Sequence, residues 1–176
     1  IVVEEGTPGF KRGKKLEKIG QHAADTSELI FEDAIVPVEN LLGQENKGFY
    51  YLMEKLQQER LVCVVQAQTA AEEALKMTIE YVKQRPMFGK TLSSFQNTQF
   101  KIAEMATEVE LGRTFTDDLI AQHMEKKDVV TQVSMAKWWV TEMAKRVIGQ
   151  CMQLHGGYGY MEEYAIARRY RDIAVT

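Results

Sequence analysis

Two charged residues occupy the apolar face of a long predicted helix. Apolar side chains recur at i, i+3 and i+4 spacing between residues 45 and 85, but Glu59 and Arg60 interrupt the series. The next turn, residues 61–65, is apolar on every face, so we expect it to be buried all round. A charge beside such a segment costs free energy unless it is paired or used in function.

Glu59 is therefore a candidate general base. A base that works near neutral pH needs a carboxylate in a dry site, where desolvation favours uptake of a proton. The apolar turn after Glu59 would supply that desolvation. The alternative is a purely structural pair of Glu59 and Arg60 at a helix crossing.

Two further segments combine residue types that bind phosphate groups and flat rings. Arg85, Phe88 and Gly89 place a cation and an aromatic ring at a turn that ends a helix. Residues 153–157 place an amide and two glycines after another helix, so a pyrophosphate or adenine can approach the backbone closely. The alternatives are an arginine that complements the helix dipole and a plain glycine cap.

The secondary structure that must position these residues changes near Gly43. Before it, residues 1–4 and 26–33 are predicted strands, joined through glycine and proline. After it, capping and terminating residues delimit helices. We expect four of them: from a cap at Asn46 to about Arg85, from Ser93 or Ser94 to residues 126–127, from a cap at Asp128 to Gly156, and from about residue 162 onward.

The apolar stripes of these helices predict how they pack. The second carries Phe95, Ile102, Met105, Ala106, Val109, Leu119 and Ile120 inward, and the third carries Val129, Val133, Ala136, Val140, Met143, Val147, Cys151 and Leu154. The predicted fold is mainly α: an antiparallel four-helix bundle in residues 44–176, incomplete at its C-terminus, preceded by the last strands of a β-domain in residues 1–43.

Composition excludes several classes of function. The net charge of −3 and the lack of a Lys/Arg cluster argue against nucleic acid as a partner. Cys63 and Cys151 lack metal-ligand spacing, so we expect small core residues in a reducing compartment and no zinc site. No run of residues approaches the eighteen or so apolar positions of a membrane span.

Four segments in the same order as in a known family complete the sequence pattern. They are residues 25–43, Gln57-Gln58-Glu59-Arg60-Leu61, Arg85-Pro86-Met87-Phe88-Gly89-Lys90 with Gln96, and Gln153-Leu154-His155-Gly156-Gly157-Tyr158-Gly159-Tyr160. Together they resemble the C-terminal part of the acyl-CoA dehydrogenase family, over nearly the whole chain. The residues nearest Glu59 resemble the long-chain and isovaleryl branches, in which the catalytic glutamate lies on this helix. In other members it lies on a loop after the fourth helix.

The resemblance implies FAD as the cofactor and an oligomer as the working form. In the family, the matching residues lie against the FAD of a neighbouring subunit, in a homotetramer that is a dimer of dimers. The residues implied in cofactor binding are Arg85, Phe88, Gln96, Gln153, Leu154, His155, Gly156 and Gly157.

The resemblance also implies the reaction. Glu59 would remove the α-proton of an acyl-CoA thioester while a β-hydride passes to FAD, giving a trans-2-enoyl-CoA as in fatty acid β-oxidation. The residues implied in substrate binding are Tyr50, Gln57, Gln58 and Arg60, although Gln57 stands where many members have Asp. Electron-transfer flavoprotein would accept the electrons. The bacterial cytoplasm is the preferred location, with the mitochondrial matrix as the alternative.

Two other functions remain open from the sequence. One is a flavin-dependent monooxygenase or oxidase on the same fold, and the other is a non-catalytic helical assembly module. Because the family's earlier domains also contribute to its flavin site, we expect residues 1–176 to be inactive alone.

Overall fold

The chain forms two compact units. The computed structural model describes all 176 residues, and the units are Ile1–Leu56 and Gln57–Thr176. The sequence predicts a boundary between residues 43 and 44, whereas the observed division falls inside the first long helix. The first turns of that helix are exposed, so they contribute nothing to the helical core.

The first unit contains an antiparallel pair of strands, β1 (Phe10–Lys15) and β2 (Ser27–Phe31). β2 confirms the predicted strand over residues 26–33. β1 was not predicted, because it is rich in Lys and Arg and lacks apolar alternation; stacking of Phe10 on Phe31, with ring centroids 5.0 Å apart, helps to hold it in place. The prediction of a strand over residues 1–4 is wrong.

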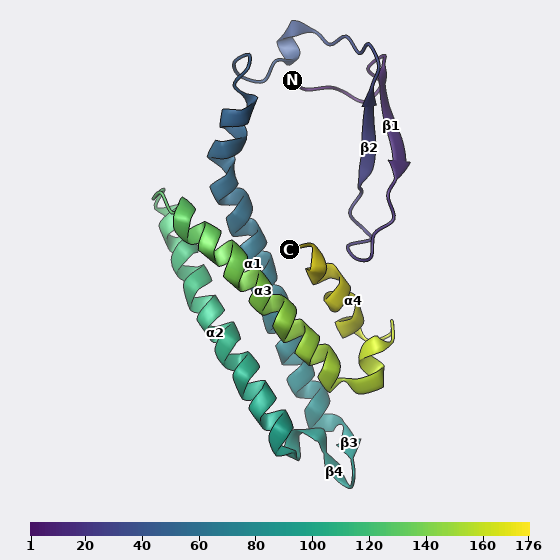
Figure 1. Ribbon diagram of the computed structural model, residues 1–176, viewed down its shortest axis with the longest axis vertical. Coiled ribbons are helices and arrows are strands. Elements are labelled where there is room, and N and C mark those ends of the chain that lie inside the picture. Colours follow the sequence, from purple (N-terminus) through teal and green to yellow (C-terminus); the bar gives the residue numbers. More distant parts are fainter. The chain divides into compact units, whose positions relative to one another are not determined.

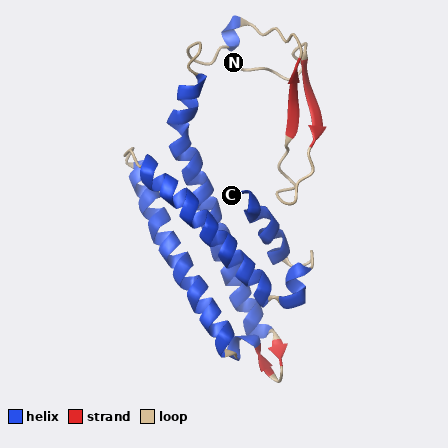
Figure 2. Cartoon of the chain, in the orientation of Figure 1, coloured by secondary structure: helices blue, strands red, loops and turns tan.

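The second unit is an antiparallel helical bundle, and this confirms the predicted fold class (Figures 1 and 2). A small hairpin of β3 and β4 connects α1 to α2 (Figure 1). Four short 3₁₀ segments also occur along the chain. The bounds are α1 (Gly48–Gln84), β3 (Pro86–Met87), β4 (Lys90–Thr91), α2 (Gln96–Met124), α3 (Val130–Leu154) and α4 (Ala165–Asp172), with η1 (Val38–Asn40), η2 (Leu92–Ser94), η3 (Gly156–Tyr160) and η4 (Ile173–Val175).

The helix ends lie within a few residues of the predicted signals. The N-cap of α3 is Val129 rather than Asp128, although the carboxylate of Asp128 accepts a hydrogen bond of 3.2 Å from the N–H of Val130, the first residue of α3. α2 begins at Gln96, after the predicted Ser93 or Ser94, and ends at Met124, before residues 126–127. α3 ends just before Gly156, whose φ of +60° only glycine adopts easily. Asn46, however, lies before α1 with a φ of 61° and is not its cap. α4 also begins slightly later than expected, at Ala165.

The apolar face of α3 forms the centre of the core. All eight stripe residues predicted on it are buried except Leu154, which is half-buried. The prediction for α2 holds less well, because Ala106 is exposed. The main core partners of α3 are Val64, Ala67, Ala71, Ala74 and Leu75 of α1, Met105, Val109 and Leu119 of α2, Ile166 of α4 and Ile173 of η4. No helix of the chain has both the length and the apolar character that crossing a bilayer requires.

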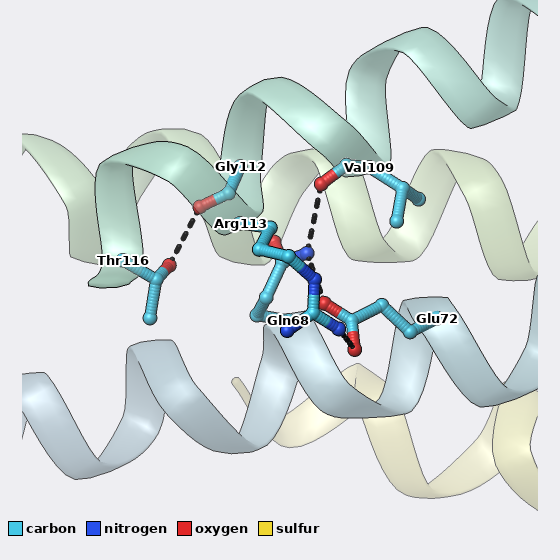
Figure 3. Close-up of polar contacts among 6 residues, drawn as sticks. All are labelled: Gln68, Glu72, Val109, Gly112, Arg113 and Thr116. Carbon is cyan, nitrogen blue, oxygen red and sulfur yellow. Dashed lines mark hydrogen bonds and ion pairs between the residues drawn. The ribbon is translucent and has the colours of Figure 1, made fainter. Parts of the chain in front are cut away.

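A buried amide joins α1 to α2 (Figure 3). Nε2 of Gln68 donates to Oε1 of Glu72 at 2.7 Å and to the carbonyl of Val109 at 2.8 Å. Glu72 in turn forms an ion pair with Arg113 of α2. A Cβ at Gly112 would lie 2.3 Å from Oε1 of Gln68, so the missing side chain at this position makes room for the amide.

We predict that Gly112→Ala lowers the free energy of unfolding by about 1 to 2 kcal/mol. The added methyl group would also lie 2.9 Å from Cε of Met143, and moving the Gln68 amide away would break its hydrogen bonds. The free-energy cost of this steric clash exceeds the gain of about 1 kcal/mol from the higher helix propensity of alanine, so the net effect is a loss of stability. Urea denaturation measures the change.

Gly149→Ala in α3 is the matched control, because a Cβ there meets only Cε2 of Tyr170, at 3.8 Å. It should leave stability unchanged or raise it by up to about 1 kcal/mol. Equal stability of the two variants would contradict the packing described at Gly112.

Candidate cofactor and catalytic sites

One cleft in the second unit gathers most of the residues that the sequence assigns to a cofactor. Its volume is about 560 Å³, and it lies between the C-terminal ends of α1 and α3 and the start of α2. We call it the Arg85 cleft. It is lined by Tyr81, Arg85, Met87, Leu92, Asn97, Thr98, Gln153, Leu154, His155, Gly156, Gly157, Tyr158 and Met161.

Three rings pack together along the inner side of this cleft. Tyr81 of α1 stacks on His155, with ring centroids 4.2 Å apart and an angle of 19° between the planes. Tyr164 meets both rings edge-on, at 6.2 Å and 6.4 Å. The Tyr81 hydroxyl also donates a hydrogen bond of 3.2 Å to the carbonyl oxygen of His155. These contacts tie the end of α1 to the turn that follows α3.

His155 is buried in its neutral form. Burial lowers the pKa of its imidazole, and the hydrogen bond from the ring to the backbone of Cys151 opposes this shift. Nδ1 lies 2.8 Å from the Cys151 carbonyl, which can only accept, so Nδ1 carries the proton. Burial also raises the pKa of Tyr81, which keeps its hydroxyl protonated as a donor.

Arg85 places a positive charge at the edge of the cleft. Its backbone N–H donates to the Tyr81 carbonyl at 2.9 Å, one turn back at the end of α1. Its guanidinium lies over the ring of Tyr158, 4.9 Å from the ring centroid. A cation held against an aromatic ring suits a ligand that carries both a phosphate and a flat ring.

The two glycines leave the backbone of the cleft uncovered. A Cβ at either Gly156 or Gly157 would meet nothing within 4 Å. Gly159, in the same turn, is different, because a Cβ there would lie 2.4 Å from the carbonyl oxygen of Met152. Gly156 and Gly157 therefore provide open space, whereas Gly159 permits tight packing of the turn.

Two of the predicted cofactor residues do not line the cleft. Phe88 lies at the tip of the β3–β4 hairpin and is 91% exposed, with a φ of 49°. Gln96 is the first residue of α2 and is also exposed. Their neighbours Met87 and Asn97 line the cleft instead.

Glu59 lies on the exposed surface of α1, away from the Arg85 cleft. The expectation that residues 61–65 are buried all round is wrong, because Val62 is 59% exposed. Only one face of this turn enters the core, as in any amphipathic helix at a bundle surface. Nor do Glu59 and Arg60 pair with each other: Arg60 donates instead to Oγ of Ser134 on α3, at 3.1 Å.

The other residues assigned to substrate binding lie in different surroundings. The Gln57 side chain accepts a hydrogen bond from the N–H of Val129 at 3.2 Å and donates to the carbonyl of Lys127 at 3.3 Å. It therefore holds α1 to the α2–α3 connection. Gln58 is exposed. Tyr50 belongs to the first unit and is 63% exposed, with the Lys47 ammonium 5.0 Å from its ring centroid.

Several residues of the cleft were not predicted from the sequence. Tyr81 precedes Arg85 by one helical turn, so helical spacing placed it on the same face. Tyr158 also lines the cleft, whereas Tyr160 is 79% exposed. Asn97 had no local signal, because only the fold brings the start of α2 to this position.

Comparison with known proteins identifies the family. Residues 46–176 match the family model described as acyl-CoA dehydrogenase, C-terminal domain. The chain belongs to the acyl-CoA dehydrogenase family. It is 49% identical over 175 residues to the long-chain specific acyl-CoA dehydrogenase of pig mitochondria, covering 99% of this chain and 41% of that protein.

Solved structures of acyl-CoA dehydrogenases share the fold. One from Geobacillus kaustophilus superimposes with a TM-score of 0.96 at 69% identity, over 98% of this chain and 46% of that one. One from Bacillus anthracis, complexed with FAD, superimposes with a TM-score of 0.91 at 28% identity, over 98% of this chain and 33% of that one. This chain spans less than half the length of the acyl-CoA dehydrogenases that it matches.

The burial of His155 predicts a loss of stability in acid. Because burial lowers its pKa in the folded protein, the unfolded chain takes up a proton first as the pH falls below about 6.5. The contribution of this group is complete above that pH and decreases below it. For each unit by which the pH falls, the free energy of unfolding of the wild type should decrease by up to about 1.4 kcal/mol more than that of His155→Gln.

Urea denaturation between pH 7.5 and 5.5 measures this difference. His22→Gln, at an exposed histidine of the first unit, is the control and should behave as the wild type does. Parallel curves for the wild type and His155→Gln would contradict the prediction.

The glycines of the turn give a matched pair of variants. Gly159→Ala should lower the free energy of unfolding by about 1 to 3 kcal/mol, because the backbone oxygen of Met152 cannot rotate away. Gly157→Ala should change it by no more than about 0.5 kcal/mol, since its methyl group points into open space. Thermal unfolding distinguishes the two, and a reversed order would refute the geometry of this turn.

Proposed function

We propose that the whole protein catalyses the α,β-desaturation of an acyl-CoA thioester to a trans-2-enoyl-CoA, with FAD as the hydride acceptor. The observation that carries this proposal is the Arg85 cleft, which gathers six of the eight predicted cofactor residues in a chain of the acyl-CoA dehydrogenase family. Glu59 supplies the base that this reaction needs.

The Arg85 cleft suits part of a dinucleotide such as FAD. The Arg85 guanidinium matches a phosphate, and the amides of Gln153 and Asn97 supply hydrogen-bond donors and acceptors. The open backbone at Gly156 and Gly157 lets a ligand come close. FAD, when bound, supplies the acceptor for the hydride from the β-carbon. The FAD complex of the relative from Bacillus anthracis supports this choice of ligand.

Glu59 acts on the substrate rather than on the cofactor. Its carboxylate takes the α-proton of the thioester, and Arg60, held by Ser134, lies beside it on α1. Because Glu59 is exposed in this chain, the desolvation that strengthens a carboxylate base comes from the bound acyl group and neighbouring protein, not from the next turn of α1. Gln58 and Tyr50 provide further contacts for the acyl-CoA, while Gln57 supports the helix.

The length of α1 supports a working oligomer. Glu59 and Arg85 are separated by 26 residues, or about 39 Å at ~1.5 Å per residue. That distance exceeds the length of one dinucleotide cofactor, so Glu59 and the Arg85 cleft serve two different FAD molecules. A homotetramer, arranged as a dimer of dimers, satisfies this requirement when each cofactor lies between two subunits. The exposed Phe88 and Gln96 would then meet the neighbouring subunit's cofactor.

The electron acceptor and the location follow from this reaction. Reoxidation of the flavin requires an electron carrier, for which electron-transfer flavoprotein is the proposed partner. The pig relative is mitochondrial and other relatives are bacterial, and we favour the bacterial cytoplasm for this chain.

The decisive test is the anaerobic bleaching of bound flavin by a panel of acyl-CoAs in the full-length protein. We expect Glu59→Gln to lower the bleaching rate by at least about 10²-fold while FAD stays bound, because only the base is removed. The acyl-CoA that bleaches the wild type fastest identifies the preferred chain length.

Glu73→Gln is the control, since Glu73 is another exposed glutamate on α1. Normal bleaching in Glu59→Gln would place the base elsewhere. Bound flavin that no acyl-CoA bleaches would favour an oxidase or monooxygenase.

A further inference from the structure

The side chain of Tyr81 helps to hold the turn between α3 and η3 in place. Tyr81 makes two separate contacts with His155: the ring stacks on the imidazole at 4.2 Å, and the hydroxyl donates to the backbone carbonyl at 3.2 Å. These residues are far apart in the sequence, so the contacts fix the end of α1 against the end of α3.

The hydrogen bond from Tyr81 fixes the direction of a peptide group in the cleft. The peptide between His155 and Gly156 is planar and trans, so its N–H points opposite to its carbonyl. When the carbonyl is drawn to Tyr81, the N–H of Gly156 is held pointing away from that hydroxyl. Gly156 has no side chain to restrict rotation and has open space around it, so the peptide is restrained by this bond together with the first turn of η3, for which His155 is the N-cap.

Tyr81 also connects this peptide to the cationic side of the cleft. Tyr164 meets the Tyr81 ring edge-on and lies 5.1 Å from the ring of Tyr158, over which the Arg85 guanidinium sits. The same group of rings therefore positions both the cation and the backbone of the cleft.

We propose that Tyr81 is a positioning residue that sets the Gly156 peptide and the Arg85 guanidinium to receive the pyrophosphate of the cofactor. This inference rests on the proposed function, because it assumes that a dinucleotide occupies the cleft. Tyr81 need not touch the phosphates itself; it acts through the residues that do. A donor held in place before binding raises affinity, since its ordering costs nothing at the moment of binding.

The test compares Tyr81→Phe, which keeps the stacked ring, with Tyr81→Leu, which loses both contacts. FAD is titrated into the apo form of the full-length protein and followed by flavin fluorescence. We expect Tyr81→Phe to weaken FAD binding about fivefold, which corresponds to about 1 kcal/mol, and Tyr81→Leu to weaken it further. Tyr170→Phe, an exposed tyrosine of α4, is the control and should bind as the wild type does.

Two smaller probes separate positioning from general loosening of the fold. Inorganic pyrophosphate and adenosine each compete with FAD, and Tyr81→Phe should weaken inhibition by pyrophosphate while leaving inhibition by adenosine unchanged. Unchanged FAD affinity, or an equal loss of affinity for both probes, would overturn the positioning role. A wild type that binds no FAD would overturn the proposed function instead.

Discussion

Burial of one face of α3 is the interaction on which the helical unit depends. Its stripe from Val129 to Cys151 is almost completely removed from solvent, and each large aliphatic side chain on it contributes about 1.5 to 3 kcal/mol. α2 and α4 both pack against α3, and the core residues of α1 join the same cluster. The two ends of α3 are also tied down, by Gln57 at its start and by the Tyr81–His155 contact at its finish.

Polar residues set the alignment of helices that the apolar core alone would leave loosely defined. The Gln57 amide holds the start of α3, and the Gln68 amide fits the gap at Gly112. Apolar contacts tolerate sliding, but a buried amide loses its hydrogen bonds if one helix shifts by a turn. This alignment matters because Glu59 lies on α1 and Arg85 directly follows it, so an error in the register of α1 would displace both.

Helical periodicity was enough to predict most of the fold from the sequence. The stripe of α3 was correct almost residue by residue, because regular spacing and a glycine stop define it completely. β1 escaped prediction because its pairing with β2, not its own pattern, makes it a strand. The burial assumed around Val62 failed for a related reason: apolar residues on all faces of a turn do not show which face has a partner.

The candidate site was predictable only in part. Resemblance to the family indicated Arg85 and residues 153–157, and the structure brings these together. Tyr81 remained hidden because its partner His155 lies more than seventy positions away, and no local pattern encodes such a contact. Phe88 and Gln96 lie outside the cleft of their own chain, where a single chain cannot reveal what they meet.

The composition of the Arg85 cleft has a consequence for the order of folding. One wall comes from residues 81–98 and the other from residues 153–161, so neither exists as a binding surface until a long loop has closed. A ligand in the cleft therefore binds the closed bundle and not the open chain, and it stabilises that bundle in proportion to the logarithm of its concentration. The bound ligand holds the two helix ends together. When the ligand dissociates, we expect these ends to open locally before the rest of the core unfolds.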